Sequence, residues 1–430
     1  MERARFTAKD RWSWILIDFA NSAFATTILA AVFPVYLPSL LPKEGIQFQI
    51  GSLSWTSTAM SLWAYTVSFS ILITLLISPL LGAWADQSAR KLRVLGIFTM
   101  IGALATIGLG WCADWKSALL TFVVANVGFT ASNVFYNALI SSAAEEKDWH
   151  KVSLQGFAWG YIGGGILLAF NLLMIMKHEW FGWPSKQQGL EWSFVSVGIW
   201  WIIFTLPALF ILKEDPPEVE ATPRALFRRV FDLWKTIKSI PQIPYMLIFM
   251  LSFAFYNDAI QTIIAMASIF GKEVLALSES TLIGTLLMIQ FLGLPFTLLM
   301  DPLEKKFGAK RVLMCSLCFW FVIVFFAYRM TNPSEFWILG VLVALVLGVS
   351  QSLSRSIFAS MIPRRRQGEF FSFFALSGKM TSIMGPLLFG FVRDATGNPR
   401  LSILSLGVLF LLGIILLFFV KVRAGAKLGA

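Results

Sequence analysis

The chain has few of the residues on which enzyme chemistry depends. Its 430 residues include two histidines, His150 and His178, and three cysteines. Cys315 and Cys318 form a C-x-x-C pair inside a long apolar run with no second pair nearby, which favours plain apolar packing over a zinc or redox site. Neither G-x-x-x-x-G-K-[ST] nor H-E-x-x-H occurs, which disfavours ATP-driven transport and an intramembrane metalloprotease. We expect no enzyme, no metal and no cofactor.

Charge is also scarce. Only 14% of the residues are charged, 57% are apolar and the mean hydropathy is +0.73. A chain of this length with so little polar surface cannot be a water-soluble globular protein, so we predict an all-α polytopic membrane protein. A membrane span needs roughly 20 mostly apolar residues. Twelve such runs occur, near residues 13–40, 59–85, 94–113, 117–143, 152–176, 192–212, 244–270, 280–300, 312–330, 335–361, 370–393 and 401–420.

The net charge of +11 follows the predicted topology. If the N-terminus is cytoplasmic, 25 of the 35 Lys and Arg residues fall in cytoplasmic segments and 8 in external loops. This asymmetry is what the positive-inside rule predicts for two cytoplasmic termini, so we expect a lipid bilayer and no nucleic acid as partner. The first run is too long and too polar for a cleavable signal peptide. We therefore expect a bacterial cytoplasmic (inner) membrane protein.

One sizeable polar stretch, residues 213–243, separates six predicted spans from six. It defines an N-terminal bundle at 1–212, a cytoplasmic linker at 213–243 and a C-terminal bundle at 244–430. Within the linker, residues 223–240 combine apolar and basic side chains in a spacing that suits a helix lying on an anionic membrane surface. A solvated linker is the alternative.

The two halves carry related segments. Asn21-Ser-Ala-Phe-Ala-Thr-Thr-Ile28 and Asn257-Asp-Ala-Ile-Gln-Thr-Ile-Ile264 share four identities, and each half contains a short hinge in which an acid is followed four and five residues later by two bases. We predict two parallel, pseudo-symmetric six-helix bundles. The hinges are expected to latch helix ends and stabilise one conformation, through Gly82, Asp86, Arg90 and Lys91 in the first half and Asp301, Lys305 and Lys306 in the second.

Polar side chains inside the spans are the candidate functional residues. A central charge costs about 2.5–3.5 kcal/mol on insertion scales, so such groups are expected to face a partner or a watery cavity. We expect a cavity lined by the runs at 13–40, 117–143, 244–270 and 335–361. The candidates for binding substrate or a coupling ion are Asp258, Lys379, Arg355, Asp18, Asn21, Asn257, Gln261, Asn133, Asn137 and Gln351. The alternative is that these groups only hold helices together.

Gly156, Gly160 and Gly164 recur every four residues within the run at 152–176. Small residues at this spacing allow two helix backbones to approach closely. We predict that these glycines serve helix packing and not a ligand.

The first hinge resembles the signature loop of the major facilitator superfamily, although Gln87 and Ala89 depart from its pattern. Four further segments resemble the vacuole-effluxer, autophagy-related branch of that superfamily over nearly the whole chain, with departures at Phe19 and Ala259. These segments are Asp18–Tyr36, Tyr256–Thr262, Gln351–Ser356 and Glu369–Lys379. The resemblance implies the major facilitator fold and membrane transport. The yeast relative of this branch is linked to amino-acid export from the vacuole.

We predict a secondary transporter that works by alternating access, as a monomer by analogy with the family, on a small polar solute such as an amino acid or similar zwitterion. Asp258 and Lys379, with Arg355, are expected to bind its ammonium and carboxylate groups. Asp258 or Asp18 could instead carry a proton, and the direction of transport stays open. The alternative function is a transport-inactive membrane sensor or scaffold whose midplane charges are structural.

Overall fold

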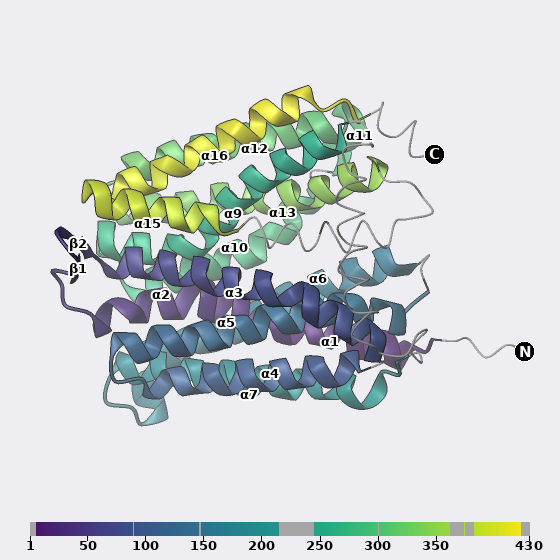
Figure 1. The fold of residues 1–430 in the computed structure, drawn as a ribbon, viewed down its shortest axis with the longest axis horizontal. Helices are drawn as coiled ribbons and strands as arrows, with labels where there is room; N and C mark the ends of the chain where they lie inside the picture. Colours follow the sequence, from purple (N-terminus) through teal and green to yellow (C-terminus); the bar gives the residue numbers. More distant parts are fainter. Residues whose placement is uncertain are drawn as a thin grey trace, which may run out of the picture. The chain divides into compact units, whose positions relative to one another are not determined.

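The computed structural model describes residues 6–88, 90–145, 148–214, 245–299, 301–361, 374 and 382–422. The chain forms two compact units, one of Met1–Pro42 and Phe69–Phe231 and the other of Lys43–Ser68 and Asp232–Ala430. Both are built almost entirely from helices (Figure 1). The chain passes from the second unit back to the first inside one helix, α3 (Ala59–Ser88).

The first unit contains the later part of α3 and a set of long helices joined by short turns. Its first span is irregular, because α1 continues as a nine-residue π-helix, η1. The described elements are α1 (Ala8–Ala23), η1 (Phe24–Val32), α2 (Phe33–Tyr36), η2 (Leu37–Leu40), α4 (Lys91–Gly108), η3 (Leu109–Trp111), α5 (Trp115–Ala138), η4 (Leu139–Ser142), α6 (Trp149–Met176), η6 (His178–Phe181) and α7 (Lys186–Ile211).

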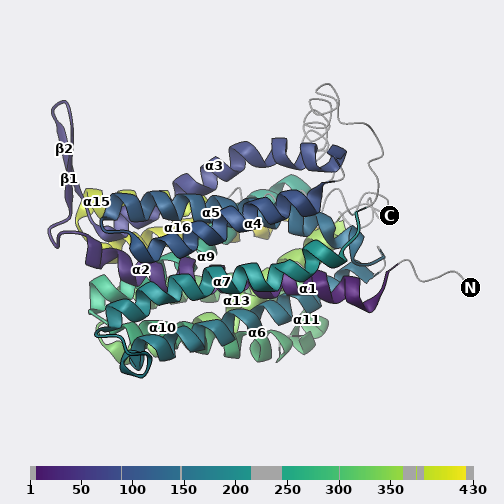
Figure 2. The same cartoon turned by 90° about the horizontal axis from the view of Figure 1, so that it is seen from below.

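The second unit contains a β-hairpin, the start of α3 and the helices of the C-terminal half. Strands β1 and β2 are antiparallel, with Ile46 paired to Ser57 and Ile50 to Leu53. The hairpin lies beside the end of α15 in both Figure 1 and Figure 2. The described elements are β1 (Ile46–Ile50), β2 (Leu53–Ser57), α9 (Met246–Leu275), α10 (Glu279–Leu299), α11 (Asp301–Phe307), α12 (Ala309–Arg329), α13 (Pro333–Met361), α15 (Met384–Thr396) and α16 (Pro399–Phe419).

Ten of the twelve predicted spans coincide with described helices that are long and apolar enough to cross a membrane. The run at 280–300 forms α10, whose apolar part within the described residues is shorter, Glu279–Gly293. The run at 370–393 is described continuously only from residue 382, where it leads into α15. The all-α polytopic fold class is confirmed, whereas the twelve-helix count, the cytoplasmic termini and the domain boundaries stay predictions. Residues 215–244, which include the proposed surface helix at 223–240, lie outside the described residues.

Glycines on α6 bring this helix against α1. A Cβ atom added at Gly160 would lie 2.6 Å from the Ser22 Oγ, and one added at Gly163 would lie 2.5 Å from the Phe19 carbonyl oxygen. At Gly164 the added atom would lie 3.0 Å from Thr26. A Cβ does not fit at Gly160 or Gly163 unless a neighbour shifts, and it is tight at Gly164, so the predicted packing role of Gly160 and Gly164 is confirmed.

The first turns of α3 are bonded to the rest of the second unit. Trp63 donates its indole N–H to the Ala265 carbonyl oxygen of α9 at 2.9 Å, and the Ser68 hydroxyl donates to the Ile383 carbonyl oxygen at 2.9 Å. Further along, α3 is bonded within the first unit, where Thr74 and Thr130 share a hydroxyl contact of 2.7 Å. Two separate sets of hydrogen bonds therefore hold the two parts of α3.

We predict that Gly163→Ala lowers the melting temperature of the purified protein. The new methyl group meets the Phe19 carbonyl oxygen, a backbone atom that cannot move aside as a flexible side chain can. Overpacking of this kind costs about 1–3 kcal/mol. Gly108→Ala is the matched control, because the nearest atom to its Cβ, Cγ2 of Thr121, lies at 3.7 Å. Equal melting temperatures for the two variants would show that α1 and α6 are not in close backbone contact.

Candidate functional site

The central feature of the second unit is a buried carboxylate on α9. Asp258 is 2% exposed, and its Oδ2 accepts a hydrogen bond of 2.7 Å from the backbone N–H of Gly385, the second residue of α15. Its other oxygen, Oδ1, is buried and has no hydrogen-bond partner among the residues that the structure describes. The Asp258 side chain on α9 therefore contacts the N-terminus of α15.

Two neighbours define the space around this carboxylate. The Thr262 hydroxyl donates to the Asp258 carbonyl oxygen at 2.7 Å, one turn along α9. A Cβ at Gly385 would collide with the Thr262 Oγ1 and would lie 2.7 Å from the Asp258 Oδ1. Only glycine lets the start of α15 approach α9 this closely. Sequence reasoning named neither as a site residue, although a Gly-Pro pair such as Gly385-Pro386 marks a turn or loop.

The electrostatics of this arrangement come from the helix terminus. Backbone N–H groups in the first turn of a helix lack partners inside the helix and carry partial positive charge, so they favour an anion. No ion pair to Asp258 occurs within the described ranges. Lys379, its predicted partner, lies outside them, so the Asp258–Lys379 pair stays a prediction.

Other predicted residues of the second unit lie on α9 and α13. Asn257 is 6% exposed and Gln261 is half-buried, so both accompany Asp258 inside the unit. Gln351 on α13 is half-buried, whereas Arg355 is exposed. A buried hydrogen bond of 2.6 Å between the hydroxyl groups of Tyr256 and Ser354 ties α9 to α13, and sequence reasoning missed this contact.

The polar centre of the first unit is uncharged. The Asn21 side chain on α1 donates to the Asn133 Oδ1 on α5 at 3.2 Å, and its own Oδ1 accepts from the Trp201 indole on α7 at 2.7 Å. The structure thus brings Asn21 and Asn133 together and adds Trp201, which sequence reasoning missed. Asn137 is exposed and bonds within its own helix, to the Asn133 carbonyl oxygen at 2.8 Å.

Asp18 lies at the interface of α1 and α6 in the first unit. It is half-buried, and a Cβ at Gly156 would lie 3.3 Å from its Oδ2 and 3.0 Å from the Tyr136 hydroxyl. Two polar side chains, those of Asp18 and Tyr136, therefore lie against α6 at Gly156.

The π-helix η1 begins directly after α1, two residues beyond Ser22. Such helices are rare and often mark functional positions. Its Thr27 is fully buried, with a hydroxyl that has no hydrogen-bond partner in the described part of the chain.

The first hinge is described only in part. The structure does not describe the side chains of residues 78–88, so the role of Gly82 and Asp86 stays a prediction, while Arg90 is exposed and Lys91 begins α4. Glu214, which sequence reasoning missed, accepts hydrogen bonds of 2.6 Å from the backbone N–H groups of both Lys91 and Leu92. A carboxylate after α7 therefore caps the N-terminus of α4.

The second hinge forms α11. The Asp301 side chain lies outside the described residues, and Lys305 and Lys306 are exposed. Glu304 of this hinge accepts a hydrogen bond of 3.4 Å from the Ser356 hydroxyl of α13. The latch role of this hinge stays a prediction.

Two carboxylates fasten the hairpin and the start of α3 within the second unit. The Asp394 Oδ2 on α15 accepts from the Ser57 hydroxyl at 2.6 Å and from the Tyr65 hydroxyl at 3.0 Å. The Glu273 carboxylate on α9 accepts from the Met60 backbone N–H at 2.9 Å and lies 3.9 Å from the Arg393 guanidinium. We call these six residues the α3 clamp.

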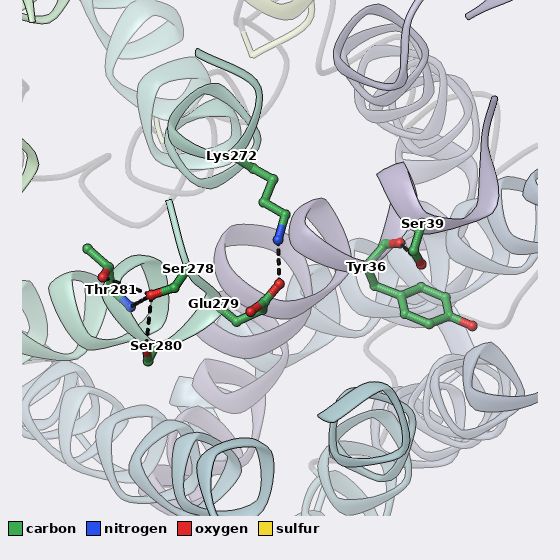
Figure 3. A network of polar contacts seen from close by, with 7 residues as sticks. All are labelled: Tyr36, Ser39, Lys272, Ser278, Glu279, Ser280 and Thr281. Atoms are coloured by element: carbon green, nitrogen blue, oxygen red, sulfur yellow. Dashed lines mark hydrogen bonds and ion pairs between the residues drawn. The ribbon is translucent and has the colours of Figure 1, made fainter. Parts of the chain in front are cut away.

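Further contacts order the neighbouring turn between α9 and α10. Figure 3 shows Lys272 directed at Glu279, with which it forms an ion pair, and the Ser278 hydroxyl beside the first residues of α10. Ser278 Oγ accepts from the Thr281 backbone N–H at 3.3 Å. No group of three or more His, Cys, Asp or Glu side chains in the described residues could hold a metal ion.

We predict that Glu214→Ala destabilises the protein, because two N–H groups at the start of α4 lose their acceptor. Loss of a capping acceptor costs about 1 kcal/mol. The measurement is thermal unfolding in detergent, with Glu179→Ala, an exposed acid of the same unit, as control. Glu214→Gln should fall between the two, since the amide keeps an acceptor but loses the charge. A Glu214→Ala protein as stable as the control would contradict the capping role.

We predict that Asp394→Ala releases the α3 clamp at one side. Both hydroxyl donors lose a charged acceptor, and hydrogen bonds to charged groups contribute about 1.5–3 kcal/mol each. Thermal unfolding should show a larger loss for Asp394→Ala than for Tyr65→Phe, which removes one of the two bonds. If Tyr65→Phe costs as much as Asp394→Ala, Ser57 contributes nothing to the clamp.

The chain is similar to known transporters over almost its full length. A family described as "Vacuole effluxer Atg22 like" matches residues 7–146 and 140–429. The MFS-type transporter YxiO of Bacillus subtilis is 33% identical over 425 residues, covering 97% of this chain and 95% of the relative. Autophagy-related protein 22 of Saccharomyces cerevisiae strain S288c is 23% identical, covering 96% and 92%.

Solved structures agree on the fold. A D-xylose-proton symporter superimposes with a TM-score of 0.70 at 14% identity, covering 97% of this chain and 98% of that one. A bacterial homologue of the human lysosomal transporter Spinster, in an inward-facing and occupied conformation, gives a TM-score of 0.65 at 14% identity and covers 97% of each chain. The fold of major facilitator transporters, which the sequence predicts, is confirmed.

Proposed function

Because the chain belongs to the vacuole effluxer Atg22-like family and is an integral membrane transporter of the major facilitator fold, we propose that it moves amino acids or similar zwitterions. The transport is secondary and proceeds by alternating access. The family description supports efflux as the direction. The Bacillus relative and the positive-inside pattern support a bacterial cytoplasmic membrane as its location. The monomer is the working unit.

The observation that carries the substrate class is the buried Asp258 on a membrane-spanning helix. A charged or protonatable group at such a position is expensive and marks an ion or substrate pathway. A carboxylate attracts the ammonium group of an amino acid. In this proposal Lys379 and Arg355 attract the substrate carboxylate, and Asn257, Gln261 and Gln351 supply further polar contacts.

The energy source is a proton or another ion, or the substrate's own gradient. Asp258 and Asp18 are the carboxylates proposed to carry a proton. Asp18 lies beside α6 in the first unit, and Asp258 lies beside α15 in the second. The hinge residues Asp86, Arg90, Lys91, Asp301, Lys305 and Lys306 set the rate of conformational change and do not bind the substrate.

A transport-inactive sensor or scaffold is the second candidate. The Asn21–Asn133–Trp201 contacts favour it, because these side chains satisfy one another and leave little for a ligand. Interhelical hydrogen bonds of this type contribute about 0.6 kcal/mol on average in membranes. The same bonds are expected where the helices only pack together.

We predict that Asp258→Asn loses transport while it keeps its fold. The measurement is uptake of a radiolabelled amino-acid mixture into proteoliposomes, with thermal unfolding of the same preparations. Flux should fall at least tenfold, because the charge is lost but the size and the acceptor for the Gly385 N–H remain. Asp148→Asn is the control, since Asp148 makes no side-chain capping bond to its helix.

The scaffold function makes the opposite prediction. Wild-type vesicles would take up none of the mixture, and Asp258→Asn would lower the melting temperature strongly. Flux in wild-type vesicles, lost in Asp258→Asn with an unchanged melting temperature, excludes a scaffold.

A further inference from the structure

The N-terminus of α15 lies inside the second unit and holds an anion of the chain itself. α15 has 13 residues, from Met384 to Thr396, and the first N–H groups of a helix have no partner within it. Gly385 donates its N–H to the Asp258 carboxylate at 2.7 Å. Helix N-termini are ready-made sites for carboxylate and phosphate groups. Here a side chain from α9 occupies such a site.

A second observation concerns the other oxygen of this carboxylate. Asp258 is 2% exposed, and within the described residues its Oδ1 makes no hydrogen bond although the atom is fully buried. A buried acceptor without a donor costs about 1–3 kcal/mol, and more when it is charged. Within the described residues, the carboxylate is therefore hydrogen-bonded to the helix terminus through one of its two oxygens.

Gly385 is buried, and its N–H faces α9, where it is bonded to the Asp258 Oδ2. Gly385 has no Cβ, and an added Cβ would meet Thr262 and the Asp258 Oδ1. Pro386, the next residue, has no N–H, so the donors of this first turn are limited to the residues before it. A small anionic group can reach the Gly385 N–H only because this position is glycine.

We propose that the N-terminus of α15 binds the carboxylate of a zwitterionic substrate. Without substrate, Asp258 accepts the hydrogen bond of the Gly385 N–H. When the substrate carboxylate accepts this bond instead, Asp258 pairs with the substrate's ammonium group. Both groups of an α-amino acid are attached to one carbon, so one molecule reaches both. This assignment rests on the proposed transport of amino acids. It makes the N-terminus of α15, and not Lys379 or Arg355, the primary contact of the substrate carboxylate.

The charges in the site restrict the class of ligand. A neutral sugar has no anionic group to displace Asp258 from the helix terminus. A simple amine pairs with Asp258 but leaves the N–H groups of α15 without an anion, and a phosphate dianion is repelled by Asp258. A zwitterion satisfies both the terminus and the carboxylate.

The test uses the full-length protein in detergent and three kinds of probe. Each of the twenty amino acids is added in a thermal-shift assay, and the one that stabilises most is compared with its decarboxylated amine and its deaminated acid. A ligand that binds the folded state raises the melting temperature according to its concentration and affinity. We expect the amino acid to bind at least tenfold more tightly than either analogue.

Two variants separate the two contacts. Gly385→Ala should weaken the binding of the amino acid at least tenfold, because its Cβ meets Thr262 and the Asp258 Oδ1. Gly293→Ala is the matched control, because its added Cβ would have no atom within 4 Å, and it should bind as the wild type does. Asp258→Asn should lower the affinity for the amino acid to that for the deaminated acid.

Several outcomes would overturn the assignment. If the decarboxylated amine binds the wild type as tightly as the amino acid does, the helix terminus holds no substrate carboxylate. This comparison uses the wild-type protein alone and does not depend on the folding of a variant. Unchanged amino-acid affinity in Gly385→Ala gives the same conclusion. Uptake of amino acids with either result leaves the proposed function standing and removes only this site. If no amino acid shifts the wild type or enters vesicles, both proposals fail.

Discussion

The structure depends on one constraint, which is that hydrocarbon offers no hydrogen-bond partners. A buried polar group of a span is therefore stabilised by a partner on the same helix or on a neighbour. Thr66, Thr74 and Thr262 bond to carbonyl oxygens one turn earlier on their own helices. Asn21 and Asn126 bond to other helices instead, at Asn133 and Ser70. Hydrogen bonds between helices therefore form where a polar side chain does not bond to its own helix.

The two units meet this constraint in different ways. In the first, the amide of Asn21 is matched on both ends by neutral partners, Asn133 and Trp201. In the second, the corresponding stretch carries Asp258, whose charge is matched by a helix terminus and not by a side chain of opposite charge within the described ranges. The repeated stretch therefore carries a neutral amide, Asn21, in one half and a carboxylate, Asp258, in the other.

Most spans could be predicted because the hydrophobic signal extends over about 20 residues and needs no tertiary information. The β1–β2 hairpin could not, because it stands outside the apolar runs and is held by distant groups such as Asp394. Asp258 was found from its charge alone. Gly385, Thr262 and Glu214 were missed, since each acts through contact with a residue far away in sequence, and neither a glycine nor a threonine in an apolar run stands out.

The continuity of α3 has a mechanical consequence. At 1.5 Å per residue, the part of α3 from Ala59 to Ser78 forms a rod about 30 Å long. Sharp kinks arise mainly at proline and glycine, and α3 has neither before Pro79. A rod without a flexible joint transmits a tilt applied at one end to the other. The α3 clamp holds the first turns of this rod. A tilt of the rod must therefore either carry the clamped end with it or break the contacts of Asp394 and Glu273.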